Sequence, residues 1–336
     1  MRTRRIIFLF LRLAIGIGLL TYLVRAKVID LHLLPRLLSD WPISAAAIVL
    51  LLLDLALMAW RLCWLFRPQG IRLSFIVSLQ LTSIGYFFAI FLPGRAGGDV
   101  AKMFYASREK SGRRTEIITV LIFDRVLGFF SLLLLPLLSA PLFPTLLSSE
   151  PLRIALALVA ILAFGIVAVF LLCLFSPAVV RRAMEGPLHF LPGRDLVLRS
   201  LGTVAVYRHN PRPLFAAMGI SLMDNAAAMS VIALGLLLMS PSSLTPSACV
   251  MVPIGVIVNS LPITPGGLGV GETAFNVMFK VAGLHGGAEA LLCWRIWTAL
   301  VGLIGLIPYL RGFQASLFEV APAPEPVLTA SRGFND

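Results

Sequence analysis

Ionisable side chains lie within or beside the long apolar runs of this sequence, where an unpaired charge costs a few kcal/mol on membrane-insertion scales. Such a residue usually faces a cavity or a charged partner, and it is therefore the first candidate for chemistry. Asp54 and Asp224 are candidates for carrying a coupling proton; structural hydrogen bonding is the alternative for both. The eight ionisable candidates are Asp54, Arg61, Asp99, Asp124, Arg125, Asp224, Glu272 and Arg295.

Two segments rich in glycine and proline interrupt apolar stretches, and each ends at an acid that can begin a helix. Their glycines permit a tight turn, and helix ends that meet there direct N–H groups and partial positive charge to one point. This suits an anion such as a lipid phosphate, although ordinary turns at helix ends are the alternative. The candidate binding residues are Pro93, Gly94, Arg95, Gly97, Gly98, Asp99 and Lys102 at the first segment, Pro265, Gly266, Gly267 and Glu272 at the second, and Asp124, Arg125 and Arg295 in the runs that follow.

The two acids at these turns, Asp99 and Glu272, need a cation or a proton. A helix dipole contributes only about 0.3–1 kcal/mol to a carboxylate, which is less than the cost of ionising it in a dry site. Arg125 and Arg295 are the nearest partners, one in the run after each turn. Asp124 lies about 100° from Arg125 around a helix, so it either pairs with a neighbouring helix or holds Arg125 or a turn in place.

The composition requires a membrane environment. Of 336 residues, 59% are hydrophobic and 13% charged, whereas soluble domains carry about 25% charge. No water-soluble packing of this length hides so much apolar surface, and in lipid the backbone polar groups must be satisfied within helices. The runs are continuous rather than alternating, which excludes a membrane β-barrel. The sequence therefore predicts an all-α polytopic membrane protein.

Six runs are long enough to span, and two more end at the glycine- and proline-rich turns. The connections 94–115 and 177–212 are strongly basic, so the positive-inside rule predicts them, and both termini, to be cytoplasmic at the cell (inner) membrane. Segments 74–105 and 246–283 then become re-entrant hairpins from opposite faces, although 74–92 is also long enough to span. The six predicted spans are 6–24, 43–60, 116–140, 154–175, 214–239 and 288–310.

The two halves of the chain predict an inverted repeat, with residues 1–140 as the first unit and 141–312 as the second. Each half contains two helices, a hairpin and a helix, and the halves begin on opposite faces. Landmark residues support the repeat: Asp54 and Asp224 differ by 170 positions, as do Arg125 and Arg295. The remaining segment, 313–336, is predicted to be a disordered cytoplasmic tail.

The distribution of charge and the absence of known motifs in the sequence argue against nucleic-acid binding, metal binding and enzymatic activity. The net charge of +12 comes from basic residues between apolar runs, which indicates the positive-inside pattern rather than nucleic-acid binding. The histidines and the four cysteines lack metal-ligand spacing. No nucleophile elbow, phosphate loop or dinucleotide fingerprint occurs, so we expect no enzymatic activity and no cofactor. The first residues are expected to form an uncleaved helix rather than a signal peptide.

The segments GYFFAIFLPGRAGGDVAKMFYA, FDRVLGF and PITPGGLGVGETAF resemble the lysylphosphatidylglycerol synthase transmembrane-region family of flippase-like proteins. The resemblance covers about residues 6–312. It departs at Phe91, where relatives often carry Asn, and no aminoacyl-transferase domain follows the membrane region. The resemblance implies translocation of lipids with anionic headgroups, beside lipid-modifying enzymes or glycosyltransferases.

The resulting hypothesis is a lipid translocase that works by alternating access around a cavity where the two hairpin tips meet. The alternatives are a membrane-embedded enzyme or accessory subunit in polyprenyl-, hopanoid- or glycolipid synthesis, and a scaffold for a lipid-modifying enzyme.

Overall fold

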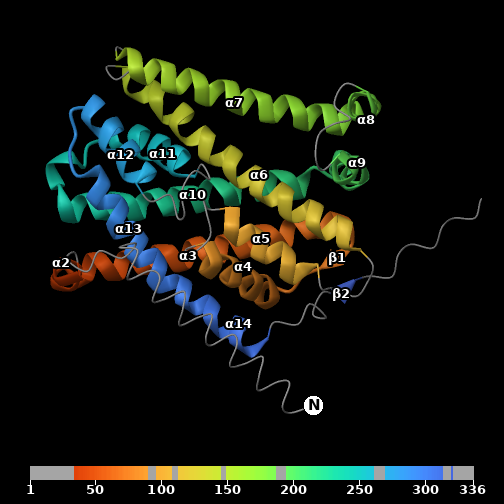
Figure 1. The fold of residues 1–336 in the computed structure, drawn as a ribbon, viewed down its shortest axis with the longest axis horizontal. Coiled ribbons are helices and arrows are strands. Elements are labelled where there is room, and N and C mark those ends of the chain that lie inside the picture. Colours follow the sequence, from red (N-terminus) through yellow and green to blue (C-terminus); the bar gives the residue numbers. More distant parts are fainter. Residues whose placement is uncertain are drawn as a thin grey trace, which may run out of the picture.

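The computed structural model describes residues 34–89, 96–107, 113–144, 149–186, 194–260, 269–312 and 319–320. Nearly all of these residues are helical (Figure 1), and the protein is an all-α polytopic membrane protein. The helices are α2 (Leu34–Ser39), α3 (Trp41–Phe66), α4 (Phe75–Ala89), α5 (Ala96–Ala106), α6 (Arg114–Ser139), α7 (Glu150–Phe175), α8 (Pro177–Glu185), α9 (Arg194–His209), α10 (Arg212–Met239), α11 (Ala248–Asn259), α12 (Val270–Val281), α13 (Gly287–Gly302) and α14 (Leu306–Arg311).

Within the described ranges, five helical segments are long and apolar enough to cross a membrane. They are Trp41–Gln69, Arg114–Leu142, Glu150–Phe175, Arg212–Met239 and Gly287–Arg311. These segments confirm five of the six predicted spans. The sixth predicted span, 6–24, lies outside the described residues.

Four shorter helices form two pairs that are consecutive in the chain, α4 with α5 and α11 with α12, and the members of each pair pack together. At 1.5 Å per residue, the 15 residues of α4 extend about 22 Å and the 12 residues of α11 about 18 Å. Both lengths are below the roughly 30 Å of a bilayer core, so neither helix alone spans it. This agrees with two helical hairpins. Their entry from opposite faces of the membrane stays a prediction, and their tips, 90–95 and 261–268, lie outside the described residues.

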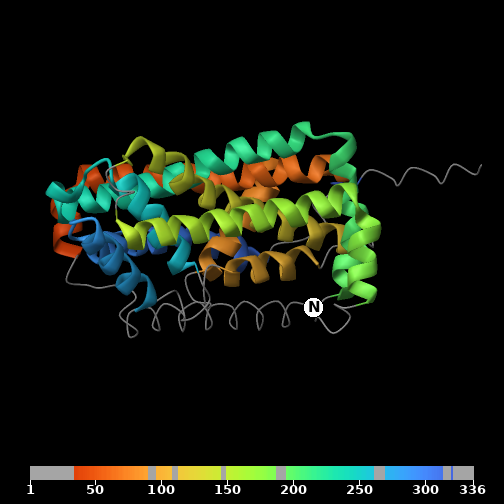
Figure 2. The same ribbon diagram turned by 90° about the horizontal axis from the view of Figure 1, so that it is seen from above.

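Helices α3 and α10 pack against each other and lie side by side in both views (Figures 1 and 2). They run in opposite directions, as do α6 and α13, which cross them obliquely (Figure 1). The buried residues of α3 recur at helical spacing, from Ala47 and Leu51 through Leu55 and Leu62. Two hydrophobic clusters fill the interior, one among α3, α10, α11 and α13, and one where the ends of α3, α4 and α6 meet.

Apolar side chains also cover the outer surface. On α7, Ile154, Leu158, Ile161 and Phe164 are each more than half exposed. A water-soluble protein rarely presents such a continuous apolar face, whereas a helix in lipid does. The exposed faces of the long helices are therefore the surfaces that contact hydrocarbon.

A two-residue β pairing joins distant parts of the chain. β1 (Ile71–Arg72) pairs antiparallel with β2 (Glu319–Val320), with Ile71 opposite Val320 and Arg72 opposite Glu319. Glu319 and Val320 belong to the segment expected to be disordered, and backbone hydrogen bonding to β1 orders these two residues. The rest of 313–336 lies outside the described residues.

Candidate functional site

The first hairpin carries one acid that two cations share. Asp99 lies in the first turn of α5, where the helix dipole favours a carboxylate. Its Oδ2 is 3.3 Å from Nε of Arg125 on α6, and its Oδ1 is 3.6 Å from Nζ of Lys102. Lys102 is only 4% exposed, whereas 34% of the Arg125 side chain is exposed. Arg125 is therefore the more exposed cation beside Asp99, and Lys102 is the buried one.

The second hairpin holds its arginine more tightly. Glu272, in the first turn of α12, accepts hydrogen bonds from Nη1 of Arg295 and from the backbone N–H of Gly269, the latter at 2.7 Å. Gly269 has φ +77°, a conformation that glycine adopts without strain. Nη2 of Arg295 also donates to Oδ1 of Asn259 at 3.1 Å, and the Arg295 side chain is 6% exposed. This arginine is enclosed by its partners.

Both acid–arginine contacts expected from the sequence are thus present in the structure. Asp99 meets Arg125 and Glu272 meets Arg295, each joining a hairpin to the long helix that follows it. The tip residues assigned to the same site, Pro93, Gly94, Arg95, Pro265, Gly266 and Gly267, lie outside the described residues. The described glycines, Gly97 and Gly98, are buried in α5.

Glycine contacts bring the two helices of each hairpin together at matching positions. A Cβ at Gly85 would lie 2.7 Å from the Lys102 side chain, and a Cβ at Gly255 would lie 2.8 Å from the ring of Phe275. Gly85 and Gly255 are 170 positions apart, and Lys102 and Phe275 are 173 apart. Each of these partners follows the hairpin acid by three residues.

A second glycine contact recurs in the same way. A Cβ at Gly98 would overlap the backbone of α4 and lie 2.9 Å from Cβ of Ala89. A Cβ at Gly271 would overlap the side chain of Asn259. Gly98 and Gly271 differ by 173 positions, and Ala89 and Asn259 by 170. The backbones of α4 and α5 can approach this closely, and the Asn259 side chain can lie against α12, only because glycine occupies these positions.

A buried arginine, Arg61, links three long helices. Its Nε is 2.6 Å from Oδ1 of Asp124 on α6, and its Nη1 is 3.1 Å from both Oδ2 of Asp224 and Oγ of Ser221 on α10. Gly128 leaves space for the guanidinium, because a Cβ there would lie 3.2 Å from Nη1. Asp124 therefore pairs with a neighbouring helix, the first of the two roles considered for it, and Arg125 is held by Asp99 instead.

Further polar contacts surround Arg61. Oδ2 of Asp54 accepts a hydrogen bond from the hydroxyl of Tyr86 on α4 at 3.1 Å. Asn225 donates to Oγ of Ser131 at 2.7 Å and to the carbonyl of Gly128 at 3.2 Å. Sequence reasoning missed Tyr86 and Ser131, since a single hydroxyl in an apolar run gives no signal of its partner.

A small cavity of about 50 Å³ joins the first hairpin to the Arg61 cluster. It is large enough for ordered water, which needs about 10–15 Å³ of such volume per molecule. Its charged lining consists of four carboxylates and two guanidinium groups, a surplus of two negative charges when all are ionised. Glu272 and Arg295 are not among its described lining residues, although Ser260 and three residues of α10, from the second half of the chain, contribute to the lining. The charged lining residues are Asp54, Arg61, Asp99, Asp124, Arg125 and Asp224.

These features define a helical membrane protein with two charged hairpins around a polar interior. The family model described as "Lysylphosphatidylglycerol synthase TM region" matches residues 9–306. The chain belongs to this family, which confirms the resemblance found in the sequence. Comparison with curated proteins and comparison with solved structures gave no match.

Proposed function

We propose that the protein is a transporter, not an enzyme, and that it moves the headgroup of an anionic phospholipid or glycolipid across the bilayer. Membership of a membrane family implicated in lipid-related function supports a lipid substrate. The observation that carries the proposal is the pair of equivalent contacts, Asp99 with Arg125 and Glu272 with Arg295, one in each hairpin. Arginine binds phosphate in a bidentate manner, and a headgroup phosphate competes directly with these carboxylates.

Arg125 is the proposed phosphate ligand in the state described. Its side chain borders the cavity and is more exposed than that of Arg295. When Arg125 turns to a phosphate, Lys102 stays beside Asp99, so no buried carboxylate loses all its cations. This matters because an uncompensated buried charge costs about 3–5 kcal/mol.

The surplus of carboxylates around the cavity constrains the rest of the headgroup. A bare phosphate would be repelled by Asp54 and Asp224, whereas hydroxyl or amine groups on the headgroup would donate hydrogen bonds to them. The proposed substrate is therefore a phosphate carrying such donor groups. Asp54 and Asp224 are also the proposed sites of a coupling proton, since protonation lowers the negative surplus.

An inverted repeat provides the proposed route to alternating access. The order of elements from α3 to α6 matches that from α10 to α13, and the glycine contacts in both hairpins recur 170–173 positions apart. The antiparallel courses of α3 and α10 and of α6 and α13 support opposite orientations (Figure 1). In this proposal the repeats rock against each other, and the enclosed Arg295 opens when the Arg125 side closes.

Translocation in reconstituted vesicles tests the proposal. Fluorescent phosphatidylglycerol, phosphatidylethanolamine and a glycolipid are placed in separate preparations, and dithionite measures the fraction that changes leaflet. We expect faster exchange of at least one lipid with the protein than without it. Arg125→Gln should lower that rate, and Arg153→Gln, on the exposed surface of α7, should not. No acceleration by well-folded protein for all three lipids would overturn the function.

The sidedness of the protein is part of the proposal. The cell membrane and cytoplasmic termini are supported by the basic connections of the chain and by the five described spans. A partner that produces or consumes the lipid, such as a lipid-modifying enzyme or a glycosyltransferase, fits a transporter without chemistry of its own.

A further inference from the structure

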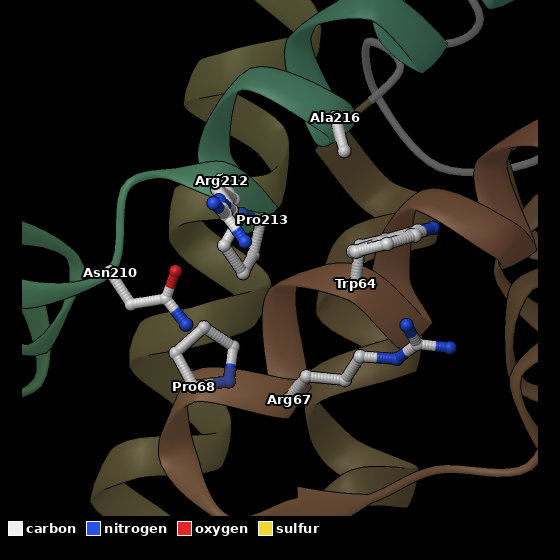
Figure 3. A pocket seen from close by; sticks show the side chains of 7 residues that line it. All are labelled: Trp64, Arg67, Pro68, Asn210, Arg212, Pro213 and Ala216. Carbon is white, nitrogen blue, oxygen red and sulfur yellow. The ribbon is translucent and has the colours of Figure 1, made fainter.

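A groove on the outer surface of α3 runs from an apolar wall to a basic rim. At the rim, a hollow of about 580 Å³ is lined by Trp64, Arg67 and Pro68 from the end of α3, and by Asn210, Arg212 and Pro213 from the start of α10. Figure 3 shows Arg67 extending beneath the ring of Trp64, with Arg212 and Asn210 on the opposite side of the opening. The guanidinium carbon of Arg67 lies 4.2 Å from the centre of that ring, in a cation–π contact.

A second hollow, of about 630 Å³, continues from Arg67 along α3. Its wall is apolar and open: Trp60 is 46% exposed and Met223 58%. Arg67 lines both hollows, so they form one groove with a charged end and a hydrocarbon-like end. Its apolar wall consists of Leu53, Ala56, Leu57, Trp60, Leu73, Phe75 and Met223, with Cys63 beside them.

The length of the groove matches one leaflet of a bilayer. Leu53 and Arg67 are 14 residues apart, which is about 21 Å along a helix axis. Half of a bilayer with its headgroup regions is about 20–22 Å thick. Trp60 and Trp64 lie between these two residues, and tryptophan is enriched at the membrane–water interfaces of membrane proteins.

The charge of the groove favours an anion. Among the described lining residues of both hollows there are two arginines and no acid. Arg212 is also the first residue of α10, so the positive end of that helix dipole adds to the rim. Basic pockets between membrane helices bind anionic headgroups.

We infer that this groove binds one anionic phospholipid of the leaflet at the Arg67 end of the bundle. The headgroup phosphate lies between Arg67 and Arg212, and an acyl chain lies along Trp60 towards Leu53. This site is distinct from the cavity of the candidate translocation pathway, because Arg61 and Asp54, which line that cavity, are buried on the side of α3 that faces the interior of the bundle. The inference does not depend on the proposed translocation.

Tryptophan quenching by brominated lipids tests the site without any transport. The protein is reconstituted in phosphatidylcholine containing a small, fixed fraction of lipid with brominated acyl chains, either phosphatidylglycerol or phosphatidylcholine. We expect brominated phosphatidylglycerol to quench more strongly than brominated phosphatidylcholine, because it is enriched in the groove. Trp60→Phe/Trp64→Phe should remove the excess quenching, since these side chains report on the groove.

The arginines are tested by a double variant with a matched control. Arg67→Gln/Arg212→Gln should weaken the preference for the anionic lipid about 25-fold, because each basic side chain near the membrane surface contributes about fivefold to the binding of an anionic lipid. Arg181→Gln/Arg182→Gln removes the same charge from the exposed α8 and should keep the preference. Equal quenching by both brominated lipids would overturn the inference. Excess quenching that survives in Arg67→Gln/Arg212→Gln, or in the double tryptophan variant, would also overturn it.

Discussion

Lys102 and Phe275 occupy matching places in the two hairpins, each three residues after the hairpin acid and each packed against a glycine of the preceding short helix. The consequence is a difference in charge. Asp99 has Lys102 as a second cation, whereas Glu272 has a phenyl ring at that place and a backbone N–H of Gly269 instead. Two hairpins built alike therefore hold their arginines with unequal strength.

This difference predicts that Lys102 makes Arg125 easier to release. In Lys102→Met, Arg125 is the cation that stays beside Asp99. Release of Arg125 would then leave a buried carboxylate unpaired, so the lipid translocation rate should fall at least about fivefold. Phe275→Met, the matched substitution in the other hairpin, should change the rate by less than twofold. Rates are measured per folded protein in vesicles. Equal effects of the two substitutions would argue against an asymmetric role of the hairpins.

The Arg61 cluster predicts a large effect on stability. Arg61→Met leaves Asp124 and Asp224 without their shared cation and should destabilise the protein by about 3–5 kcal/mol. Thermal unfolding in detergent measures this, with Arg153→Gln as an exposed control expected to stay within about 0.5 kcal/mol of wild type. Arg61→Met/Asp124→Asn/Asp224→Asn should recover part of the loss, because the two carboxylates that paired with Arg61 are replaced by neutral amides. A triple variant less stable than Arg61→Met would contradict the account of this cluster.

The glycine contacts predict position-specific effects of alanine. Gly98→Ala and Gly271→Ala should each destabilise the protein by about 1–3 kcal/mol, because the added methyl group overlaps the facing helix or side chain. Gly219→Ala in α10 is the control, since nothing lies within 4 Å of a Cβ there. It should be neutral or stabilising, as alanine favours helix. Unchanged stability of both hairpin variants would show that the helices are not so closely packed.

The topology is tested by cysteine labelling in a cysteine-free background. Residues 94–115 are strongly basic, whereas residues 140–151 contain no Lys or Arg. The positive-inside rule therefore predicts that Lys110→Cys reacts from the cytoplasmic side and Ser148→Cys from the outside. A membrane-impermeant maleimide applied to intact cells, and then to inverted vesicles, distinguishes the two faces. Labelling of both positions from the same face would contradict the inverted repeat.

Much of the fold follows from hydropathy alone. The five described spans coincide with apolar runs, because continuous hydrophobicity and the need to satisfy backbone groups in lipid leave few alternatives to helices. The partners of Asp99 and Glu272 were also predictable, since each acid needs a cation and Arg125 and Arg295 are the nearest. Chain order was sufficient to find these contacts.

Other features depend on packing that a sequence does not display. Arg61 was a candidate because it lies beside the predicted run 43–60, but the sequence did not indicate that acids of α6 and α10 would share it or that it would be only 2% exposed. The separation of Glu272 and Arg295 from the central cavity has the same origin: it depends on how the second hairpin packs against α13. The groove beside Trp60 is built from α3 and the start of α4 together with α10, which is distant from them in the chain.

The central claim is that the two hairpin acids serve one translocation pathway, and a double-mutant cycle on the translocation rate tests it most directly. Asp99→Asn, Glu272→Gln and the double variant are compared with wild type in the same vesicles, with stability measured in parallel. The account predicts that each single variant lowers the rate and that the double variant departs clearly from the product of the two single effects, because residues of one pathway are coupled. Strictly independent effects, each accompanied by only about 1 kcal/mol of lost stability, would contradict the claim and return both acids to the role of helix caps.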